Sequence, residues 1–209
     1  MNFFEIKNIA IQIWDYPVSY IELFGTLFGL YSVYFASRAN ILTWATGIVN
    51  EIFLFILFFQ VQLYADMFLQ LYFLVVTIYG WYNWKTNNAD KINSKINFKN
   101  KLLIAATIII LTIIFGFLFL NIHLYLPNYF KIKAAFPIID SFVMILSIVA
   151  TVLLAKKKIE NWYLWIAVDI VCVGLYFKKG IYFLSLEYLI FLGLSLYGLY
   201  NWRKQLKHD

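Results

Sequence analysis

The sequence predicts an all-α polytopic membrane protein with seven transmembrane helices, in which two parallel, pseudo-symmetric three-helix repeats flank a central fourth helix (3+1+3). Three observations support this fold class. Of the 209 residues, 63% are hydrophobic and only 13% are charged, with a mean hydropathy of +0.76, which leaves too few polar groups to cover a soluble domain. The apolar residues form runs of about 20, the length that crosses a bilayer. The sequence also matches itself when it is shifted by 118 residues.

Short polar breaks separate the apolar runs. The predicted spans are 18–37, 40–60, 63–84, 101–121, 135–155, 161–178 and 180–202. Because backbone polar groups in lipid must be paired within the segment, runs of this length are expected to be helices. The resulting divisions are an N-terminal segment, the first repeat, a linker with the fourth helix, the second repeat and a C-terminal tail, at 1–17, 18–84, 85–134, 135–203 and 204–209.

The distribution of basic residues predicts the orientation in the membrane. Most of the 17 lysines and arginines lie on one side of the predicted topology, around Arg38, residues 85–101, residues 156–158 and the C-terminal tail. The positive-inside rule places this side in the cytoplasm, so we expect the N-terminus outside and the C-terminus inside. The net charge of +6 then reflects membrane topology, and we expect the lipid bilayer, and no nucleic acid, as a partner.

The internal repeat is clearest at residues that apolar bias does not explain. Trp44 aligns with Trp162, Glu51 with Asp169, and the segment 79–84 with 197–202. The fourth span has no counterpart, and it returns the chain so that both copies enter the membrane from the same face. Parallel repeats related by an axis along the membrane normal are typical of transporters that bind substrate near the midplane, between the halves.

Carboxylic acids inside the predicted spans are the first candidates for a binding site. Glu22, Glu51, Asp169 and Glu187 lie within apolar runs that hold no lysine or arginine at mid-span. A charge at bilayer depth costs about 2.5–3.5 kcal/mol or more, so such residues are candidates for function.

Tryptophans accompany two of these acids at helical spacing. Trp162, Trp165 and Asp169 follow one another at i, i+3 and i+7, which is one helix face, and Trp44 and Glu51 are again seven residues apart. Each half thus presents an aromatic plane and a carboxylate on one stripe. Such a stripe suits a planar, cationic or strongly polar ligand, through cation–π contact and stacking.

Several of these residues also have a purely structural interpretation. Trp44 and Trp162 begin their spans and fit an interfacial anchor equally well, and Trp84 and Trp202, beside Lys85 and Arg203, are predicted to be such anchors. Five glycines are expected to allow close approach of helices during a rocking motion of the halves, or simply to pack: Gly25, Gly29, Gly47, Gly174 and Gly193.

Other chemistry is scarce in this sequence. The histidines are His123 and His208, and Cys172 lies in an apolar run with no histidine nearby, so we expect no disulfide, no metal site and no cofactor. No nucleophile–base pair or phosphate-binding loop is recognisable, so we expect no enzyme. A passive channel, a ligand-capture subunit of a larger transporter and a membrane enzyme remain competing classes.

Several segments resemble the PnuC family of vitamin transporters. They are 40–44, 63–73, 78–84, 161–165 with Asp169, and 197–202, and the likeness spans most of 18–203. The resemblance implies the same 3+1+3 arrangement, a homotrimer and the bacterial inner membrane. It also implies facilitated uptake of nicotinamide riboside, trapped inside by phosphorylation. Members of the family are further implied to carry thiamine or riboflavin, and thiamine is our alternative substrate.

The candidate substrate-binding residues combine the resemblance with the polar stripe. The resemblance carries over Trp44, Asn50, Gln70, Asn161, Trp162, Trp165 and Asp169. The stripe adds Glu51, Glu187 and Tyr188. The sequence departs from the family pattern at Ala45, where proline is expected, and at Glu51 directly after Asn50, which bears on selectivity.

Overall fold

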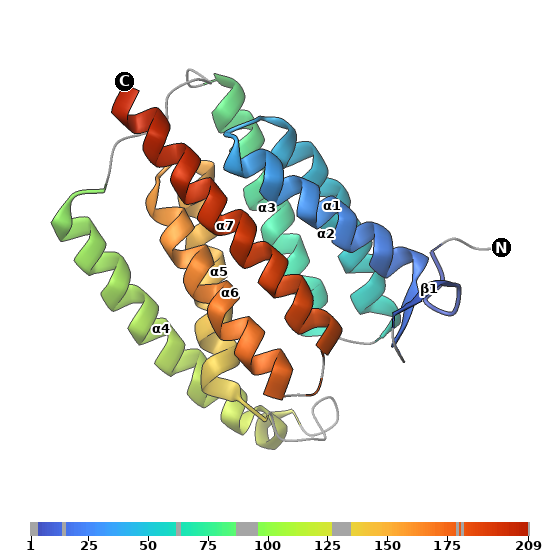
Figure 1. Cartoon of the computed structure of the whole chain (residues 1–209). Helices are drawn as coiled ribbons and strands as arrows, with labels where there is room; N and C mark the ends of the chain where they lie inside the picture. Colours follow the sequence, from blue (N-terminus) through green and yellow to red (C-terminus); the bar gives the residue numbers. More distant parts are fainter. Residues whose placement is uncertain are drawn as a thin grey trace.

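In the residues that it describes, the computed structural model has seven long helices preceded by a short β-hairpin (Figure 1). It describes residues 4–13, 16–61, 64–86, 96–126, 135–178, 180 and 182–208. Parts of the predicted N-terminal segment, of the third and seventh spans, of the linker 85–134 and of the tail lie outside these ranges. The hairpin consists of β1 (Ile9–Ile13) and β2 (Tyr16–Ser19), and the helices are α1 (Tyr20–Ser37), α2 (Leu42–Gln60), α3 (Tyr64–Thr86), α4 (Phe98–Tyr125), α5 (Pro137–Ala155), α6 (Glu160–Lys178) and α7 (Tyr182–His208).

The helices form two groups of three with one helix outside. Neighbours along the chain pack together within α1–α3 and within α5–α7, and the groups meet where α1 contacts α7 and α3 contacts α5. The long helix α4 lies against α5 at the outside of the bundle (Figure 1). We call the end of the bundle where α1, α3, α5 and α7 finish and α2 and α6 begin the C-terminal end, because the chain ends there.

The observed helices match the predicted spans in number and within a few residues in position at most ends. Three helices in the described part of the chain are long and apolar enough to cross a membrane by length and composition, namely α2, α4 and α5. Of the remaining four, α6 and α7 carry six of the ten candidate residues, whereas α1 carries none.

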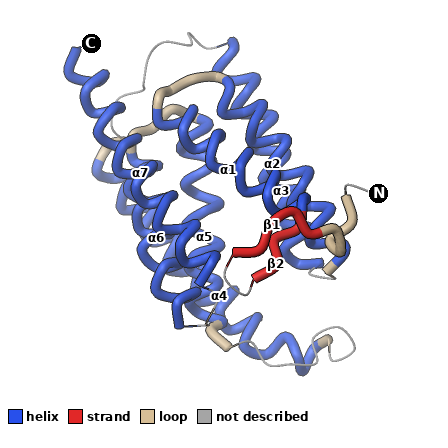
Figure 2. The backbone as a smooth tube through the Cα atoms, turned by 45° about the vertical axis from the view of Figure 1, so that its right-hand side comes forward, coloured by secondary structure: helices blue, strands red, loops and turns tan. Residues whose placement is uncertain are grey.

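The hairpin was not expected from the sequence, in which residues 1–17 were only assigned as an N-terminal segment before the first span. Strands β1 and β2 pair antiparallel, with Ile13 opposite Tyr16 (Figure 2). The Gln60 side chain at the end of α2 holds the chain just before the hairpin, since Ile6 N donates to Gln60 Oε1 at 3.0 Å and Gln60 Nε2 donates to the Phe4 carbonyl at 2.6 Å. This segment therefore lies across the end of the bundle opposite the C-terminal end.

Glu22 caps helix α1. It forms a capping box with Ser19, in which Ser19 Oγ accepts from the Glu22 amide and Ser19 N donates to Glu22 Oε2 at 2.8 Å. The Tyr16 hydroxyl also donates to Glu22 Oε1 at 2.7 Å. Burial and this hydrogen bond raise the pKa of Tyr16 to about 12, so the phenol remains a donor at neutral pH. The structure therefore gives Glu22 a capping role at the start of α1.

Replacing Ser19 by alanine is expected to lower the stability of the protein in detergent by about 1 kcal/mol, because the Glu22 amide at the start of α1 loses its acceptor. Thermal unfolding followed by circular dichroism measures the effect. Glu22→Gln keeps an acceptor for the Ser19 amide and is expected to cost less. Equal stability of Ser19→Ala and the unchanged protein would show that the cap does not hold α1.

Two tight turns at the C-terminal end of the bundle repeat each other. Ala39 has φ 52° and Lys157 has φ 51°, and these residues are 118 apart. The Ala39 amide donates to the Ala36 carbonyl at 2.9 Å, and the Lys157 amide donates to the Leu154 carbonyl at 2.9 Å. Matching left-handed residues in matching turns support the duplication inferred from the sequence, whereas the axis that relates the halves in a membrane remains a prediction.

Candidate functional site

The two tryptophans that begin α2 and α6 lie flat against glycines of the third helix in their own half. Trp44 is 2% exposed and covers Gly80 of α3, and Trp162 is 1% exposed and covers Gly198 of α7. A Cβ added at Gly198 would lie 2.6 Å from the Trp162 ring, and one added at Gly80 would overlap the Trp44 ring. Only glycine leaves room for the indole at these positions.

The two buried acids contact the same third helices, one turn away from the glycines. Thr77 Oγ1 donates to Glu51 Oε1 at 2.5 Å, and Ser195 Oγ donates to Asp169 Oδ2 at 2.8 Å. Glu51 and Asp169 are 8% and 2% exposed. No lysine or arginine within the described residues forms an ion pair with either acid. The predicted stripes of tryptophan and acid are thus each held against the third helix of the same half.

Four polar atoms among the candidate residues are buried without a hydrogen-bond partner in the described structure. They are Trp44 Nε1, Glu51 Oε2, Asn161 Oδ1 and Trp162 Nε1. Buried polar groups in folded proteins are nearly always paired with protein or ordered water, so each exception requires an explanation. A small polar ligand or bound water could form hydrogen bonds with these two indole donors and two oxygen atoms.

The candidate amides differ in their surroundings. Asn50 Nδ2 donates to the Gly25 carbonyl of α1 at 2.8 Å, which ties α2 to α1. Asn161 is fully buried, and its Nδ2 donates to the Lys158 carbonyl at 2.6 Å. Gln70 is buried on α3, seven residues before Thr77 and hence on the same face. The structure therefore gives Asn50 a packing role and places Gln70 two helical turns from Thr77 on the same face of α3.

The remaining candidates lie along α6 and α7. Trp165 packs against both hydrophobic clusters of the bundle, and Tyr188 packs against the one around Val168 and Cys172. The Tyr188 ring stacks on Tyr176 with 5.4 Å between centroids. Glu187 is half-buried and is hydrogen-bonded by the Thr26 hydroxyl of α1, nearer the hairpin end. Glu187 is therefore farther from the tryptophans than the other acids are.

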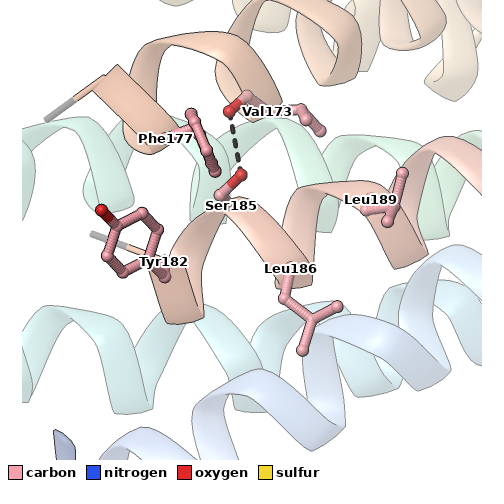
Figure 3. Close-up of a pocket in the computed structure, with 6 residues that line it drawn as sticks. All are labelled: Val173, Phe177, Tyr182, Ser185, Leu186 and Leu189. Atoms are coloured by element: carbon pink, nitrogen blue, oxygen red, sulfur yellow. Dashed lines mark hydrogen bonds between the residues drawn. The ribbon is translucent and has the colours of Figure 1, made fainter. Parts of the chain in front are cut away.

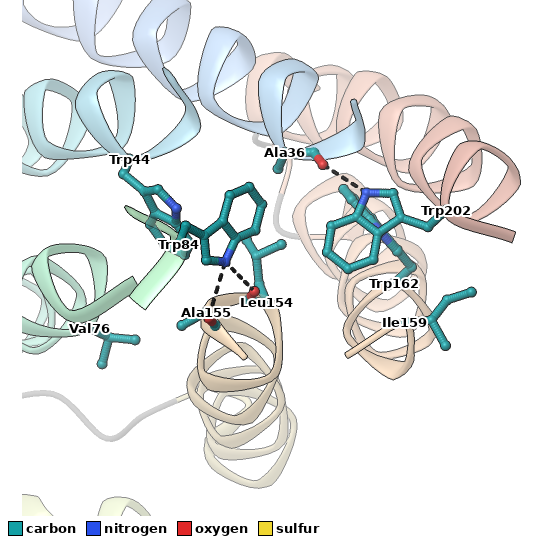
Figure 4. Packing of buried hydrophobic residues seen from close by; sticks show 9 residues of the cluster. All are labelled: Ala36, Trp44, Val76, Trp84, Leu154, Ala155, Ile159, Trp162 and Trp202. Carbon is teal, nitrogen blue, oxygen red and sulfur yellow. Dashed lines mark hydrogen bonds between the residues drawn. The ribbon is translucent and has the colours of Figure 1, made fainter. Parts of the chain in front are cut away.

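Trp84 and Trp202 are not interfacial anchors, and this prediction from the sequence is wrong. They are 1% and 0% exposed and lie at the centre of the cluster at the C-terminal end (Figure 4). Their indole nitrogens donate to carbonyls of the opposite half, and their rings contact those of Trp44 and Trp162 edge to face. Trp44 and Trp162, for which an anchor was an equal alternative, are buried as well.

An apolar pocket of about 410 Å³ lies elsewhere, between the end of α6 and the start of α7 (Figure 3). Its lining residues are Val173, Phe177, Tyr182, Ser185, Leu186 and Leu189. The Ser185 hydroxyl already donates to the Val173 carbonyl at 2.9 Å. The pocket contains none of the candidate residues and offers mainly apolar contact, so it is not the predicted site.

Comparisons with known proteins agree with this architecture. A sequence model of the family described as nicotinamide mononucleotide transporter matches residues 19–204. The nicotinamide riboside transporter PnuC of Escherichia coli (strain K12) is 33% identical over 227 aligned residues, which cover 97% of this chain and 94% of that protein. The riboflavin/roseoflavin transporter RibM of Streptomyces davaonensis is 23% identical, covering 98% of this chain and 94% of its own.

A solved structure shares the fold. The crystal structure of the vitamin B3 transporter PnuC aligns with a TM-score of 0.67 and 24% sequence identity, covering 90% of this chain and 83% of that one. The family match covers most of the chain, and the relatives are membrane transporters rather than enzymes. The chain therefore belongs to the PnuC family, and it is a seven-helix membrane transporter of the vitamin-transporting class.

Proposed function

We propose that this protein takes up nicotinamide riboside by facilitated diffusion across the bacterial inner membrane, and that phosphorylation inside the cell traps the vitamin. The observation that carries the proposal is the doubled pair of a buried indole and a buried acid, Trp44 with Glu51 and Trp162 with Asp169. Each pair is held on a glycine and a hydroxyl of the neighbouring helix.

The buried acids of the two pairs, Glu51 and Asp169, support a cationic ligand. An acid buried among apolar helices is costly when it is ionised, unless an opposite charge or a set of hydrogen-bond donors compensates. One hydroxyl donor is present at each acid, and neither acid forms an ion pair with a basic side chain among the described residues. The pyridinium ring of nicotinamide riboside carries a permanent positive charge and a flat face, so it supplies both the missing cation and a partner for stacking.

The unpartnered atoms support the rest of the same ligand. The indole donors of Trp44 and Trp162 and the Asn161 oxygen have no partner in the described structure. Ribose hydroxyls and a carboxamide group can both accept and donate hydrogen bonds. The ten candidate residues remain our proposed binding set, with Asn50 acting through α1 and Glu187 at the hairpin side.

Thiamine is the alternative substrate of the same class. Its thiazolium ring is also permanently cationic and aromatic, so the buried acids and indoles fit it by the same reasoning. Riboflavin, which the name of one relative mentions, has a larger and uncharged ring, so the buried acids favour it less. A ligand-capture subunit of a larger transporter is the alternative of another class, and it would bind a vitamin tightly without carrying it alone.

Calorimetry on the purified protein in detergent tests the assignment, with nicotinamide riboside, thiamine and riboflavin titrated side by side. We expect nicotinamide riboside to bind most tightly and riboflavin most weakly. Tight binding of thiamine alone would move the assignment to the alternative substrate. Binding of none of the three by a protein that unfolds cooperatively would contradict the vitamin assignment.

Three further parts of the proposal concern the whole molecule. We propose parallel halves at 18–84 and 135–203 that rock about the site, an N-terminus outside and a C-terminus in the cytoplasm, and a homotrimer as the resemblance implies. Cysteine labelling from either side of the membrane tests the orientation, and light scattering of the detergent complex tests the trimer.

A further inference from the structure

Each half of the bundle is hydrogen-bonded to the end of the other half's first helix. In the first half, Trp84 Nε1 donates to the carbonyls of Leu154 and Ala155 at 3.3 and 3.1 Å (Figure 4). The neighbouring Asn83 Nδ2 donates to the Ala155 carbonyl at 2.9 Å. These acceptors lie in the last turn of α5, so the end of α3 is fastened to the opposite half.

The second half returns the same contacts. Trp202 Nε1 donates to the Ala36 carbonyl at 3.0 Å (Figure 4), and Asn201 Nδ2 donates to the Ser37 carbonyl at 3.4 Å. Donors and acceptors all stand 118 residues from their counterparts in the first half. The two halves thus exchange equivalent contacts at the C-terminal end of the bundle, and we name Asn83, Trp84, Asn201 and Trp202 the tryptophan clasp.

The clasp also joins the candidate binding residues of the two halves through ring contacts. Trp44 meets Trp84 edge to face at 5.1 Å, Trp84 meets Trp202 at 6.3 Å, and Trp202 meets Trp162 edge to face at 5.7 Å. All four rings are buried. A displacement of the Trp44 or Trp162 ring by a ligand therefore has to move the clasp, because interiors of this density transmit displacement.

We propose that the tryptophan clasp is the gate that closes the C-terminal end of the bundle and opens in each transport cycle, with Trp84 and Trp202 positioning Trp44 and Trp162. This inference rests on the proposed transport function. The gate closes onto carbonyls of the last helical turn, where the Ala36 and Leu154 carbonyls each accept from a turn amide as well as from an indole. Water can replace the indole and amide donors at these carbonyls when the halves separate. Because exchanging protein for water partners changes the free energy only modestly, the open and closed states can interconvert readily.

One half of the clasp carries an additional cation. Lys157 Nζ lies 4.7 Å from the centroid of the Trp84 ring, and Lys157 is buried. Its counterpart in the first half is Ala39, which has the same left-handed backbone. Alanine is therefore compatible with this turn, and Lys157→Ala removes the cation while the backbone is kept. We expect the gate to open more readily in this variant.

Thiol accessibility tests the gate without any substrate. Ala36, whose carbonyl accepts from Trp202, is 2% exposed, and a cysteine placed there reports opening through its rate of alkylation by a membrane-impermeant maleimide. Peptide mass spectrometry distinguishes this cysteine from the buried Cys172.

Trp202→Phe removes the N–H but keeps a ring, and it is expected to raise the alkylation rate roughly tenfold, the equivalent of one lost hydrogen bond. Trp81→Phe, on the exposed side of α3, is the matched control and should leave the rate unchanged. Equal rates for Trp202→Phe and Trp81→Phe overturn the proposal.

A cross-link tests whether opening is needed for transport. The double variant Ser37→Cys with Asn201→Cys is treated with a short, cleavable bis-thiol reagent in proteoliposomes. We expect uptake of nicotinamide riboside to stop on cross-linking and to return on reduction, with each single variant unaffected by the reagent. Undiminished uptake by fully cross-linked protein contradicts the gate. Absence of uptake from the unchanged protein would instead count against the proposed function. The alkylation rates would still test whether the clasp acts as a gate.

Discussion

Asp169→Asn is expected to weaken the binding of nicotinamide riboside by about tenfold to a hundredfold, the range expected when a hydrogen bond or ion contact to a charged group is lost. Asparagine keeps the size of the side chain and can still accept from Ser195, whose hydroxyl lies 2.8 Å from the carboxylate. It cannot balance a cationic ring. Calorimetry in detergent measures the affinity, and thermal unfolding measures the stability. We expect the stability to be equal or higher, because a buried acid without a cation is costly.

Glu51→Gln is the matched variant in the other half. Glu51 is bonded to Thr77 in the same way, so we expect a loss of affinity for the cation of similar size. Affinity for the uncharged riboflavin should change little in either variant. A variant that binds nicotinamide riboside as tightly as the unchanged protein would show that its acid does not face the ligand.

Gly198→Ala is expected to destabilise the protein by about 1–3 kcal/mol, the usual cost of forcing additional atoms into a packed interior. The new Cβ would lie 2.6 Å from the Trp162 ring, and the ring also packs edge to face with Trp202 at 5.7 Å. We also expect ligand affinity to fall, because Trp162 has to turn away from its present position. Gly80→Ala should behave in the same way through Trp44.

Gly193→Ala provides the control on the same helix. A Cβ at Gly193 would have no atom within 4 Å, and the same holds for Gly174 of α6. Alanine there should leave stability unchanged or raise it by up to about 1 kcal/mol, since the unfolded chain loses freedom. If Gly198→Ala and Gly193→Ala unfold at the same temperature, the packing of the Trp162 indole does not require glycine at position 198.

The helices could be predicted from the sequence because their signal is local. A run of about 20 apolar residues needs no distant partner to be recognised, and the spans were placed to within a few residues at most ends. The hairpin could not be found in this way. The chain just before it is bonded to the side chain of Gln60, 54 residues from Ile6, and no pattern in residues 1–17 predicts that contact.

The role of a tryptophan could not be read from its position in a span. Trp84 and Trp202 stand beside Lys85 and Arg203 at helix ends, which is the pattern of an interfacial anchor. Their burial comes from contacts with residues 70 and 166 positions away. The glycines show the same limit. Gly25, Gly29 and Gly47 do lie close to neighbouring helices, but Gly174 and Gly193 face open space, so this expectation was wrong for two of the five.

The candidate site was visible in part through the repeat. The register of 118 residues paired Trp44 with Trp162 and Glu51 with Asp169, and the structure gives both pairs the same surroundings. The hydroxyl partners Thr77 and Ser195 were missed, although they fall in the same register and both carry a hydroxyl group. A search of the repeat for matching chemistry, rather than for identical residues, would have found them.

Uptake into proteoliposomes tests the central claim most directly. Purified protein is reconstituted without any ion gradient, and entry of labelled nicotinamide riboside is followed with and without a nicotinamide riboside kinase and ATP inside. The proposed function predicts entry down the gradient until the two sides are equal, accumulation only when the kinase is enclosed, and little entry with Asp169→Asn. Tight binding without entry would point instead to a ligand-capture subunit, and accumulation that requires an ion gradient but no kinase would contradict facilitated diffusion.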